Sequence, residues 1–363
     1  MSGTLLTPES GPRTRVRPTG TSFVGLVGVE LRRLWWRRMA KVVLVAVVAF
    51  VGVSAYAAYQ QTRPEALAER IEDYSSIVAE TTRQNASIPA DEKAAQIEAC
   101  QRDEAATGAD TSGGAPVDFR CEQMFDPPSP ESFGIVAAER TAITSSIVES
   151  GLWIFGFLAF ILGASFVAAE FAAGSMGNWL TFEPRRVRVG TSKLVAAGLG
   201  GLAVGGLGVG LATLGATLVT TVNRPGADLP VAAAPIVPGD TAAQSLLRVV
   251  AIVGLGGLGG AVIGLLLRST AGVIGLVVGW LVLVEAFVAS AFAEGRLQPW
   301  FLRTNIEGFV SDGTTYFATR CGVDGCQTVS MPHSYTASWI YLLVVTSLGV
   351  TAALLAFRAR DVT

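Results

Sequence analysis

Residues 150–193 read SGLWIFGFLAFILGASFVAAEFAAGSMGNWLTFEPRRVRVGTSK. The first twenty, 150–169, carry no charge and are almost all apolar. This is the length and character of a helix that crosses a bilayer core about 30 Å thick. The composition changes abruptly at Glu170, which is followed by glycines, Trp179, Pro184 and a group of arginines. The stretch therefore predicts a transmembrane helix that ends in a basic loop.

The whole chain has the composition of an integral membrane protein. Of its 363 residues, 50% are hydrophobic and only 15% are charged, which is too apolar for an ordinary soluble protein. Five further apolar stretches are long enough to cross a bilayer. We expect an all-α membrane protein with six transmembrane helices, at residues 41–60, 150–169, 192–222, 244–267, 271–293 and 337–357.

Basic and acidic residues lie on opposite sides of these helices. Arginines are concentrated in residues 1–40, in the 170–191 loop, at Arg268 and in the tail 358–363, and the positive-inside rule makes this side cytoplasmic. Residues 61–149 contain 17 acidic and 7 basic side chains, a net charge of −10. They are expected outside, with 223–243 and 294–336. The chain is thus predicted to be a multi-pass plasma-membrane protein with both termini in the cytoplasm, and no nucleic-acid partner is indicated.

The N-terminal region combines a polar tail with an amphipathic segment. Residues 1–20 have the composition of a disordered tail. Residues 21–40 are predicted to form an interfacial helix, with its tryptophans in the acyl boundary and its arginines toward anionic lipid headgroups. A plain positively charged anchor for the first span is the alternative, and a secretory signal is not expected because the first apolar span begins so late. The apolar face is Phe23, Val27, Leu31, Leu34 and Trp35, and the polar residues are Glu30, Arg33, Arg37 and Arg38.

The outer segment 61–149 is too long for a simple connector. Its parts beginning at Pro64 and Asp91 have helical composition, whereas 107–130 is rich in Gly, Asp and Pro. A small helical lobe is therefore predicted. The last outer segment, 294–336, is interrupted by Pro299 and Pro332 and is expected to contain short helices that dip back into the outer leaflet.

All four cysteines lie in the predicted outer segments. Disulfides form in oxidising compartments, so Cys100–Cys121 and Cys321–Cys326 are the natural pairs. A zinc site at the second pair is the weaker alternative. The only histidine of the chain, His333, leaves too few ligands for a tetrahedral site, and no metal is expected.

Several glycines recur at a spacing of four in the third and fourth spans. This GxxxG spacing allows close approach of helix backbones in lipid. The spacing is compatible with two roles, packing within the bundle and a contact between subunits, and the sequence leaves both open. The pairs are Gly201 and Gly205, Gly206 and Gly210, Gly256 and Gly260, and Gly260 and Gly264.

Sequence motifs for catalysis are missing from the chain. It contains no GxxxxGK[ST] phosphate loop and no HExxH motif, so an enzyme site and a cofactor in this chain are not expected. Two ionisable residues fall within apolar stretches, Glu285 and Arg248, and such residues are costly against lipid. They are candidates for a substrate pathway or gate, or for a polar contact between helices.

The 170–191 loop has the features of a docking element. Gly174 allows a bend, Asn178 to Phe182 can form a short helix, and Pro184 ends it. An ordinary basic loop needs no aromatic and apolar side chains at its surface. Trp179, Leu180 and Phe182 therefore favour a helix that enters the groove of a protein partner.

This loop resembles the "E…GT…lL..P.sR…K" pattern of ABC-2-type transporter permeases, the membrane subunits of type V ABC exporters. The residues that match are Glu170, Gly174, Ser175, Leu180, Pro184, Arg185, Arg186 and Lys193. The VELRRLWWRR segment before the first span, the six spans, Glu285 in the fifth span, and Pro299 with Asn305 before the sixth also have counterparts in that family. Serine stands at 175 where threonine is usual, and the first outer segment is longer than in compact members.

The resemblance implies a membrane subunit moved by a separate ATPase subunit, which would bind ATP and Mg. A second permease copy or homologue would complete the exporter of a drug, peptide, lipid or other amphiphile, and the outer lobe could bind an extracellular partner. The main alternative is a membrane sensor or assembly factor that does not transport. The residues expected at the ATPase are Glu170, Gly174, Ser175, Asn178, Trp179, Leu180, Phe182, Glu183, Pro184, Arg185 and Arg186.

Overall fold

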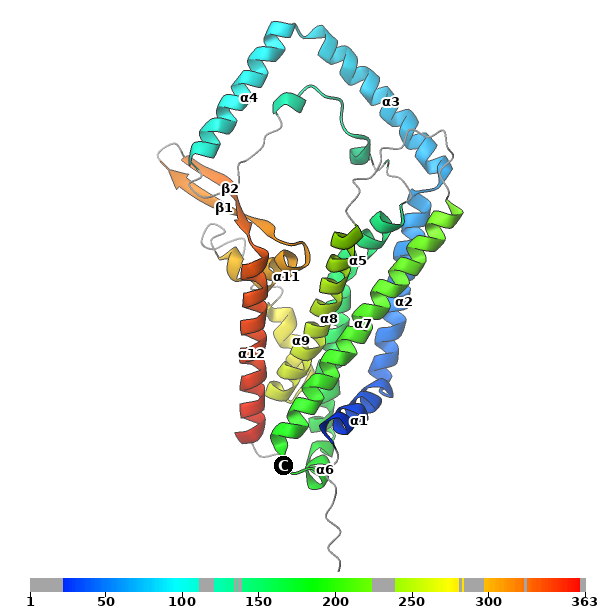
Figure 1. Cartoon of the computed structure of the whole chain (residues 1–363), viewed down its shortest axis with the longest axis vertical. Coiled ribbons are helices and arrows are strands. Elements are labelled where there is room, and N and C mark those ends of the chain that lie inside the picture. Colours follow the sequence, from blue (N-terminus) through cyan, green and yellow to red (C-terminus); the bar gives the residue numbers. More distant parts are fainter. Residues whose placement is uncertain are drawn as a thin grey trace, which may run out of the picture.

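The computed structural model describes residues 22–110, 121–133, 135, 139–223, 239–280, 283, 297–322 and 325–359. These residues form a helical bundle with an arch at one end (Figure 1). The α-helices are α1 (Phe23–Trp35), α2 (Arg38–Gln61), α3 (Pro64–Ser87), α4 (Ala90–Asp110), α5 (Arg140–Ala172), α6 (Ser175–Phe182), α7 (Arg186–Val222), α8 (Gly239–Leu267), α9 (Thr270–Gly279), α11 (Leu302–Val310) and α12 (Tyr335–Ala359). Short 3-10 turns occur at Cys121–Gln123, Pro130–Phe133 and Gln298–Trp300, and β1 (Thr314–Gly322) pairs with β2 (Gly325–His333).

Five helices are long and apolar enough to cross a membrane: α2, α5, α7, α8 and α12. They correspond to five of the six predicted spans. The remaining predicted span, 271–293, overlaps at its start with the ten-residue helix α9. Most of the residues of this span lie outside the described ranges. The sixth span therefore stays a prediction. Helices α5 and α7 begin before the apolar stretches that predicted them, because hydropathy detects only the apolar part of a helix.

The centre of the bundle is built from α5, α7 and α8, whose backbones approach closely at glycines. A Cβ atom placed on Gly260 of α8 would overlap the carbonyl oxygen of Phe160 on α5, and one on Gly257 would lie 2.6 Å from the carbonyl oxygen of Ala197 on α7. A Cβ on Gly206 or Gly210 would meet nothing within 4 Å. The glycines therefore serve packing within this chain at Gly201, Gly205, Gly256, Gly260 and Gly264, whereas Gly206 and Gly210 face away from it.

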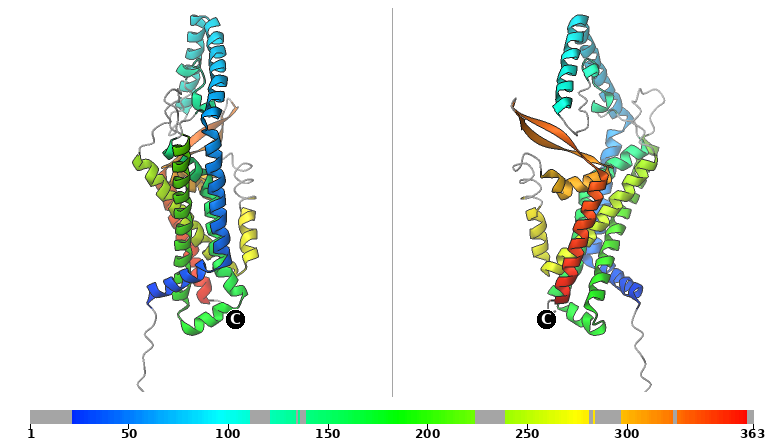
Figure 2. Two further views of the ribbon diagram at one scale, coloured as in Figure 1. Left: turned by 90° about the vertical axis from the view of Figure 1, so that its right-hand side faces the viewer. Right: turned by 60° about the vertical axis from the view of Figure 1, so that its left-hand side comes forward.

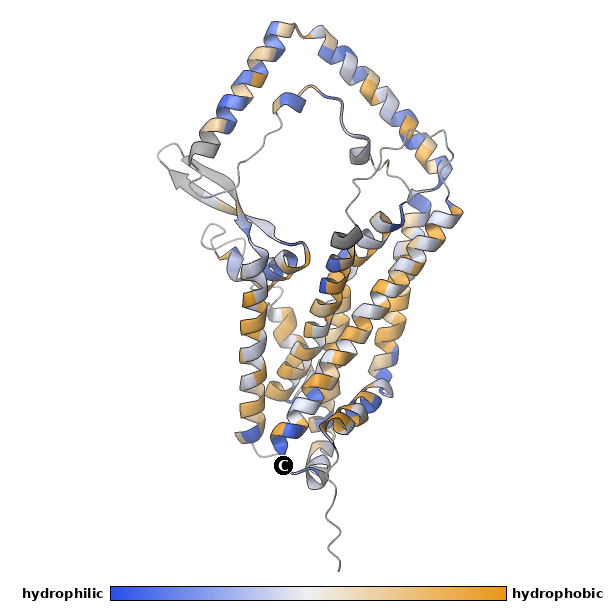
Figure 3. Cartoon of the chain, in the orientation of Figure 1, coloured by the Kyte–Doolittle hydropathy of each residue, from blue (hydrophilic) through white to orange (hydrophobic). Residues whose placement is uncertain are grey.

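Helices α2 and α12 lie at the periphery and expose most of their apolar side chains. The hydropathy colouring shows an apolar bundle and a polar arch (Figure 3). Large exposed side chains on α2 and α12 include Val45, Val53, Leu343, Leu348 and Leu355. Apolar surfaces of this extent are expected of helices that face lipid.

The arch consists of α3 and α4, which meet at the end of the molecule farthest from α6 (Figures 1 and 2). A disulfide joins Cys100 of α4 to Cys121, with Cα atoms 5.7 Å apart, as predicted for this cysteine pair. Helices α3 and α4 match the two segments of predicted helical composition. The base of the arch is tied to the bundle by Asn223. Its side-chain amide donates to the carbonyl oxygen of Tyr59 at 2.7 Å and to the hydroxyl of Thr62 at 2.9 Å.

The segment before α12 contains a short helix and a hairpin. The expected short helix is present as α11, but the antiparallel β1 and β2 were not predicted. The hairpin projects outward from the arch end of the bundle, near the start of α12 (Figure 2). Its register places Cys321 directly opposite Cys326, which supports the predicted pairing, although a disulfide here remains a prediction because these side chains are outside the described set.

The Pro299 and Asn305 pattern has a structural explanation. Asn305 is fully buried, and its amide nitrogen donates at 2.8 Å to the carbonyl oxygens of both Pro299 and Phe301. Its amide oxygen lies 3.1 Å from Nε2 of His333 on β2. Because the amide nitrogen already has two acceptors, the oxygen faces His333 and Nε2 is the donor. Asn305 thus ties the turn before α11 to the hairpin.

The packing of His333 predicts a pH dependence for this region. Burial lowers the pKa of His333 below its usual value. In a detached hairpin the imidazole would therefore take up its proton at a higher pH than in the packed state, and the packing should weaken as the pH falls through about 6.5 and below. We expect faster hydrogen exchange of β2 at pH 5 than at pH 7.5 after correction for intrinsic rates. A His333→Gln variant should lose most of the difference; an equal difference in this variant would contradict the assignment.

Candidate functional site

Helix α6 lies at the end of the bundle opposite the arch, together with α1 and the end of α12 (Figure 1). Gly174, with φ of 65°, separates it from α5, and this left-handed conformation suits glycine. Glu183 is extended, as expected before a proline, and α7 begins at Arg186. The bend at Gly174 and the end of the helix before Pro184 are as predicted, but the short helix begins at Ser175, three residues before the predicted Asn178.

The surface of α6 differs in part from the expectation. Trp179 is only partly exposed, because the guanidinium of Arg33 lies over its ring at 5.0 Å. The sequence suggested a freely exposed aromatic at this position, and the structure does not show one. The side chains of Asn178, Leu180 and Phe182 lie outside the described set, and their predicted role stays a prediction.

The remaining loop residues flank this helix. The hydroxyl of Ser175 donates to the carbonyl oxygen of Glu170 at 3.3 Å, which a threonine hydroxyl could also do. Glu183 pairs with Arg188 at 3.4 Å. Pro184 and Arg185 are exposed, so this side of the loop is open to a partner.

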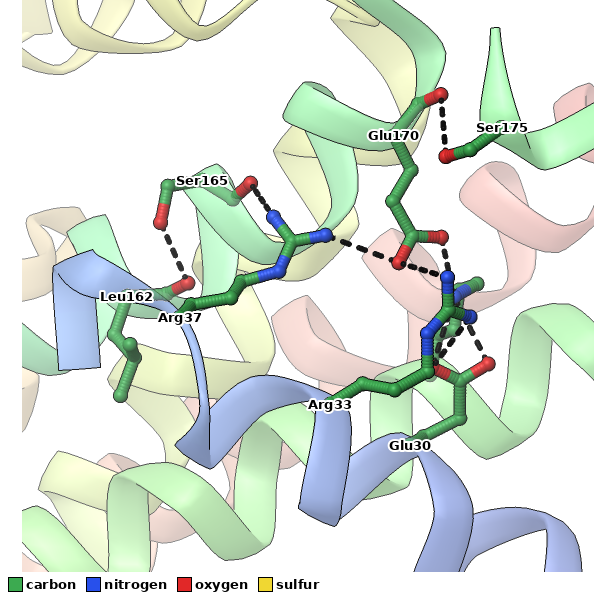
Figure 4. Close-up of polar contacts among 8 residues, drawn as sticks. Glu30, Arg33, Arg37, Leu162, Ser165, Glu170 and Ser175 are labelled. Carbon is green, nitrogen blue, oxygen red and sulfur yellow. Dashed lines mark hydrogen bonds and ion pairs between the residues drawn. The ribbon is translucent and has the colours of Figure 1, made fainter. Parts of the chain in front are cut away.

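A group of five charged side chains joins three helices at the root of α6. This ion cluster consists of Glu30 and Arg33 from α1, Arg37 from the α1–α2 corner, Glu170 from α5 and Lys193 from α7. Figure 4 labels the first four of these residues. Glu170 is its centre, with oxygens 2.6 Å from Lys193 Nζ, 3.0 Å from Arg37 and 3.3 Å from Arg33. The Lys193 ammonium also lies 2.9 Å from Glu30. Arg37 further donates to the carbonyl oxygen of Ser165 at 2.9 Å.

The two carboxylates and the lysine of the ion cluster are shielded from solvent, whereas Arg37 and Arg33 are 25% and 34% exposed. The side chains of Glu30 and Lys193 are 0% exposed and that of Glu170 is 2% exposed. The ring of Phe166 lies 5.1 Å from both the Arg37 and the Lys193 cations. Such burial makes each charge dependent on its partners, because removing one partner of a buried pair is far more costly than breaking a surface pair.

Three of these side chains are oriented differently from what the sequence suggested. Glu30 was expected on the solvated face of the interfacial helix, and Arg33 and Arg37 were expected at lipid headgroups. The face of α1 that packs on the bundle instead carries Leu26, Val27, Glu30 and Leu34. The signal was present, since Glu30 stands four residues from both Leu26 and Leu34, a spacing that shares one helix face.

Burial also affects the charge state of Arg37. It lowers the pKa of the guanidinium, while Glu170 opposes this change by favouring the charged form. An arginine side chain remains protonated in proteins. Arg37 is therefore a permanent cation in the ion cluster.

The second pair of candidate residues lies toward the arch. Arg248 pairs with Asp312 at 2.9 Å and lies over the ring of Tyr335 at 4.5 Å. These contacts join α8 to the turn before β1 and to the start of α12. The expected partner, Glu285, lies outside the described residues, so a Glu285–Arg248 contact and a pathway or gating role stay predictions.

Comparison with known proteins gives no family assignment. No protein-family model matches the chain, and no curated protein is significantly similar to it.

Proposed function

We propose that the chain is the membrane permease subunit of an ATP-driven exporter, with α6 as the element that docks on a separate ATPase subunit. The observation that carries this proposal is the position of the ion cluster. It lies directly behind a short helix at the end of the bundle, and it joins that helix's root to α1, α5 and α7.

The ion cluster gives a movement of α6 a route into the bundle. Only Ala173 and Gly174 separate α6 from α5, so displacement of α6 acts on Glu170. Buried ion pairs keep their geometry because breaking them is costly, and Glu170 would move with Lys193 of α7 and Arg37 beside α2. Nucleotide binding by the partner can shift the bundle between states only if the partner binds those states differently.

The orientation follows from charge. The end that carries α6 and the arginines would be cytoplasmic by the positive-inside rule, which puts the arch and its disulfide outside the plasma membrane, where disulfides persist. This chain would hydrolyse no ATP, the partner would hold ATP and Mg, and a second permease would complete the pathway. The substrate class would be an amphiphile, such as a drug, peptide or lipid.

One observation favours a membrane sensor as the second candidate. Helix α2 continues into α3 of the arch with only two intervening residues, and Asn223 fixes this joint. A ligand bound by the arch could therefore act through α2 on the ion cluster. A sensor of this kind would purify without an ATPase partner.

Replacing both Trp179 and Phe182 by aspartate should abolish co-purification of the ATPase subunit. The physical reason is that α6 would lose both aromatic side chains of its docking surface, and the aspartate at 182 would have to be desolvated in the docking groove. The measurement is the yield of ATPase per permease after affinity purification, with membrane insertion checked by size exclusion.

Trp300→Asp is the matched control, because Trp300 is 71% exposed at the other end of the bundle. It should retain the complex. Unchanged yield in the Trp179 and Phe182 variant would refute docking through α6, and absence of any ATPase with the wild-type chain would favour the sensor.

A further inference from the structure

The charges of the ion cluster are unequal. Two arginines and one lysine face two carboxylates, so its described members carry a net charge of +1. A charge that is removed from water without an opposite charge beside it destabilises the protein. A carboxylate placed next to such a cation reduces this loss of stability. The described members of the ion cluster therefore leave one positive charge without a matching carboxylate.

The surplus charge is located at Arg33. Lys193 and Arg37 each have an oxygen partner within 3.0 Å, whereas Arg33 is 3.3 Å from Glu170 and 3.6 Å from Glu30. Its Nη1 has no hydrogen-bond acceptor in the described part of the chain. With 34% of its side chain exposed, Arg33 is also the most open of the five.

A second unsatisfied donor lies beside Arg33. The indole Nε1 of Trp179 is buried and finds no acceptor among the described side chains and backbone, and the Arg33 guanidinium lies over this same ring. A buried donor without an acceptor is destabilising, because it has lost its hydrogen bonds to water. Among the described residues, two donors on α1 and α6 thus lack hydrogen-bond acceptors at one place, where Glu30 Oε1 and Glu170 Oε2 have ion-pair contacts with Lys193 but no hydrogen-bond donor of their own.

We propose that a carboxylate side chain of the ATPase subunit completes the ion cluster at Arg33 when α6 is docked. This inference rests on the proposed function and names the chemistry of the partner at that site. A group that reaches Arg33 beside Trp179 also touches α6, which makes an acidic side chain of the docked subunit the matching anion. Because both unsatisfied atoms are shielded, the carboxylate reaches them only when α6 shifts against α1, and docking then moves α6.

The test is carbodiimide coupling in the purified complex with an Arg33→Lys variant. The reagent joins an amine to a carboxylate that contacts it, and peptide mass spectrometry locates the product. We expect a product between position 33 and an aspartate or glutamate of the ATPase subunit. Arg32→Lys is the matched control, since Arg32 is the exposed neighbour on α1 and should give no such product. Coupling to Glu30 or Glu170 within the chain shows that the reagent has reached the site.

The outcomes separate the two proposals. If the ATPase is present but position 33 couples only within the chain, or if the control couples to the ATPase equally, the inference is overturned and the docking function stands. If no ATPase accompanies the wild-type chain, the docking function itself fails.

If Arg33→Lys does not fold, the wild-type complex provides the same test. Modification of Arg33 by phenylglyoxal should be several-fold slower in the complex than in the isolated chain, while Arg32 reacts alike in both. Equal reaction of Arg33 in the two samples would overturn the inference.

Discussion

Replacing Glu170 by glutamine is expected to destabilise the chain by about 3–5 kcal/mol, the range for removing one partner of a buried ion pair. Glu170 contacts all three cations of the ion cluster, and its loss would raise the net charge there from +1 to +2. We expect the midpoint of thermal unfolding, followed by size exclusion in detergent, to fall by roughly 10 °C.

Two further variants sharpen this prediction. Glu183→Gln is the control, because Glu183 forms an ion pair in the same loop but outside the ion cluster, and its loss should change the midpoint little. Lys193→Met should have an intermediate effect, because it leaves two cations with two carboxylates but separates Glu30 from its closest partner. A midpoint for Glu170→Gln equal to that of the wild-type chain would show that this carboxylate contributes no stability.

Replacing Gly260 by alanine is expected to destabilise the bundle by about 3 kcal/mol, at the upper end of the range for overpacking. The added Cβ would overlap the carbonyl oxygen of Phe160, which is backbone and cannot rotate away. Helices α5 and α8 would have to separate. The measurement is again the thermal midpoint of the purified chain.

Gly206→Ala is the matched control for this change. Its Cβ would meet nothing within 4 Å, and alanine has the better helix propensity by about 1 kcal/mol. The control should therefore be neutral or slightly more stable. If both substitutions lower the midpoint by the same amount, Gly260 is not required for the close approach of α5 and α8.

These two predictions also bear on the proposed function. In a bundle whose central helices are in backbone contact, a shift of one helix moves its neighbours, because close-packed interiors have low compressibility. The ion cluster lies where α5 and α7 leave the bundle toward α6. A variant such as Glu170→Gln that still assembles with an ATPase should lose coupling more than docking.

The sequence predicted part of the site for a local reason. Gly174, Pro184 and the short helix between them were readable because each reports the conformation of its own backbone. The partners of Glu30 and Lys193 were not readable, because they stand 163 residues apart and meet only when α1 packs on α7.

By itself, the sequence determined the helical membrane class, five of the spans and the Cys100–Cys121 pair. Each depends on the length, composition or compartment of a continuous segment. Only the tertiary structure decided which way each helix faces about its own axis. This rotation placed Glu30 inward, Gly206 outward and Gly260 against α5. It also brought five charged side chains from distant segments into the ion cluster. The rotation of each helix cannot be read from its own segment, because it follows from the packing of all the helices together.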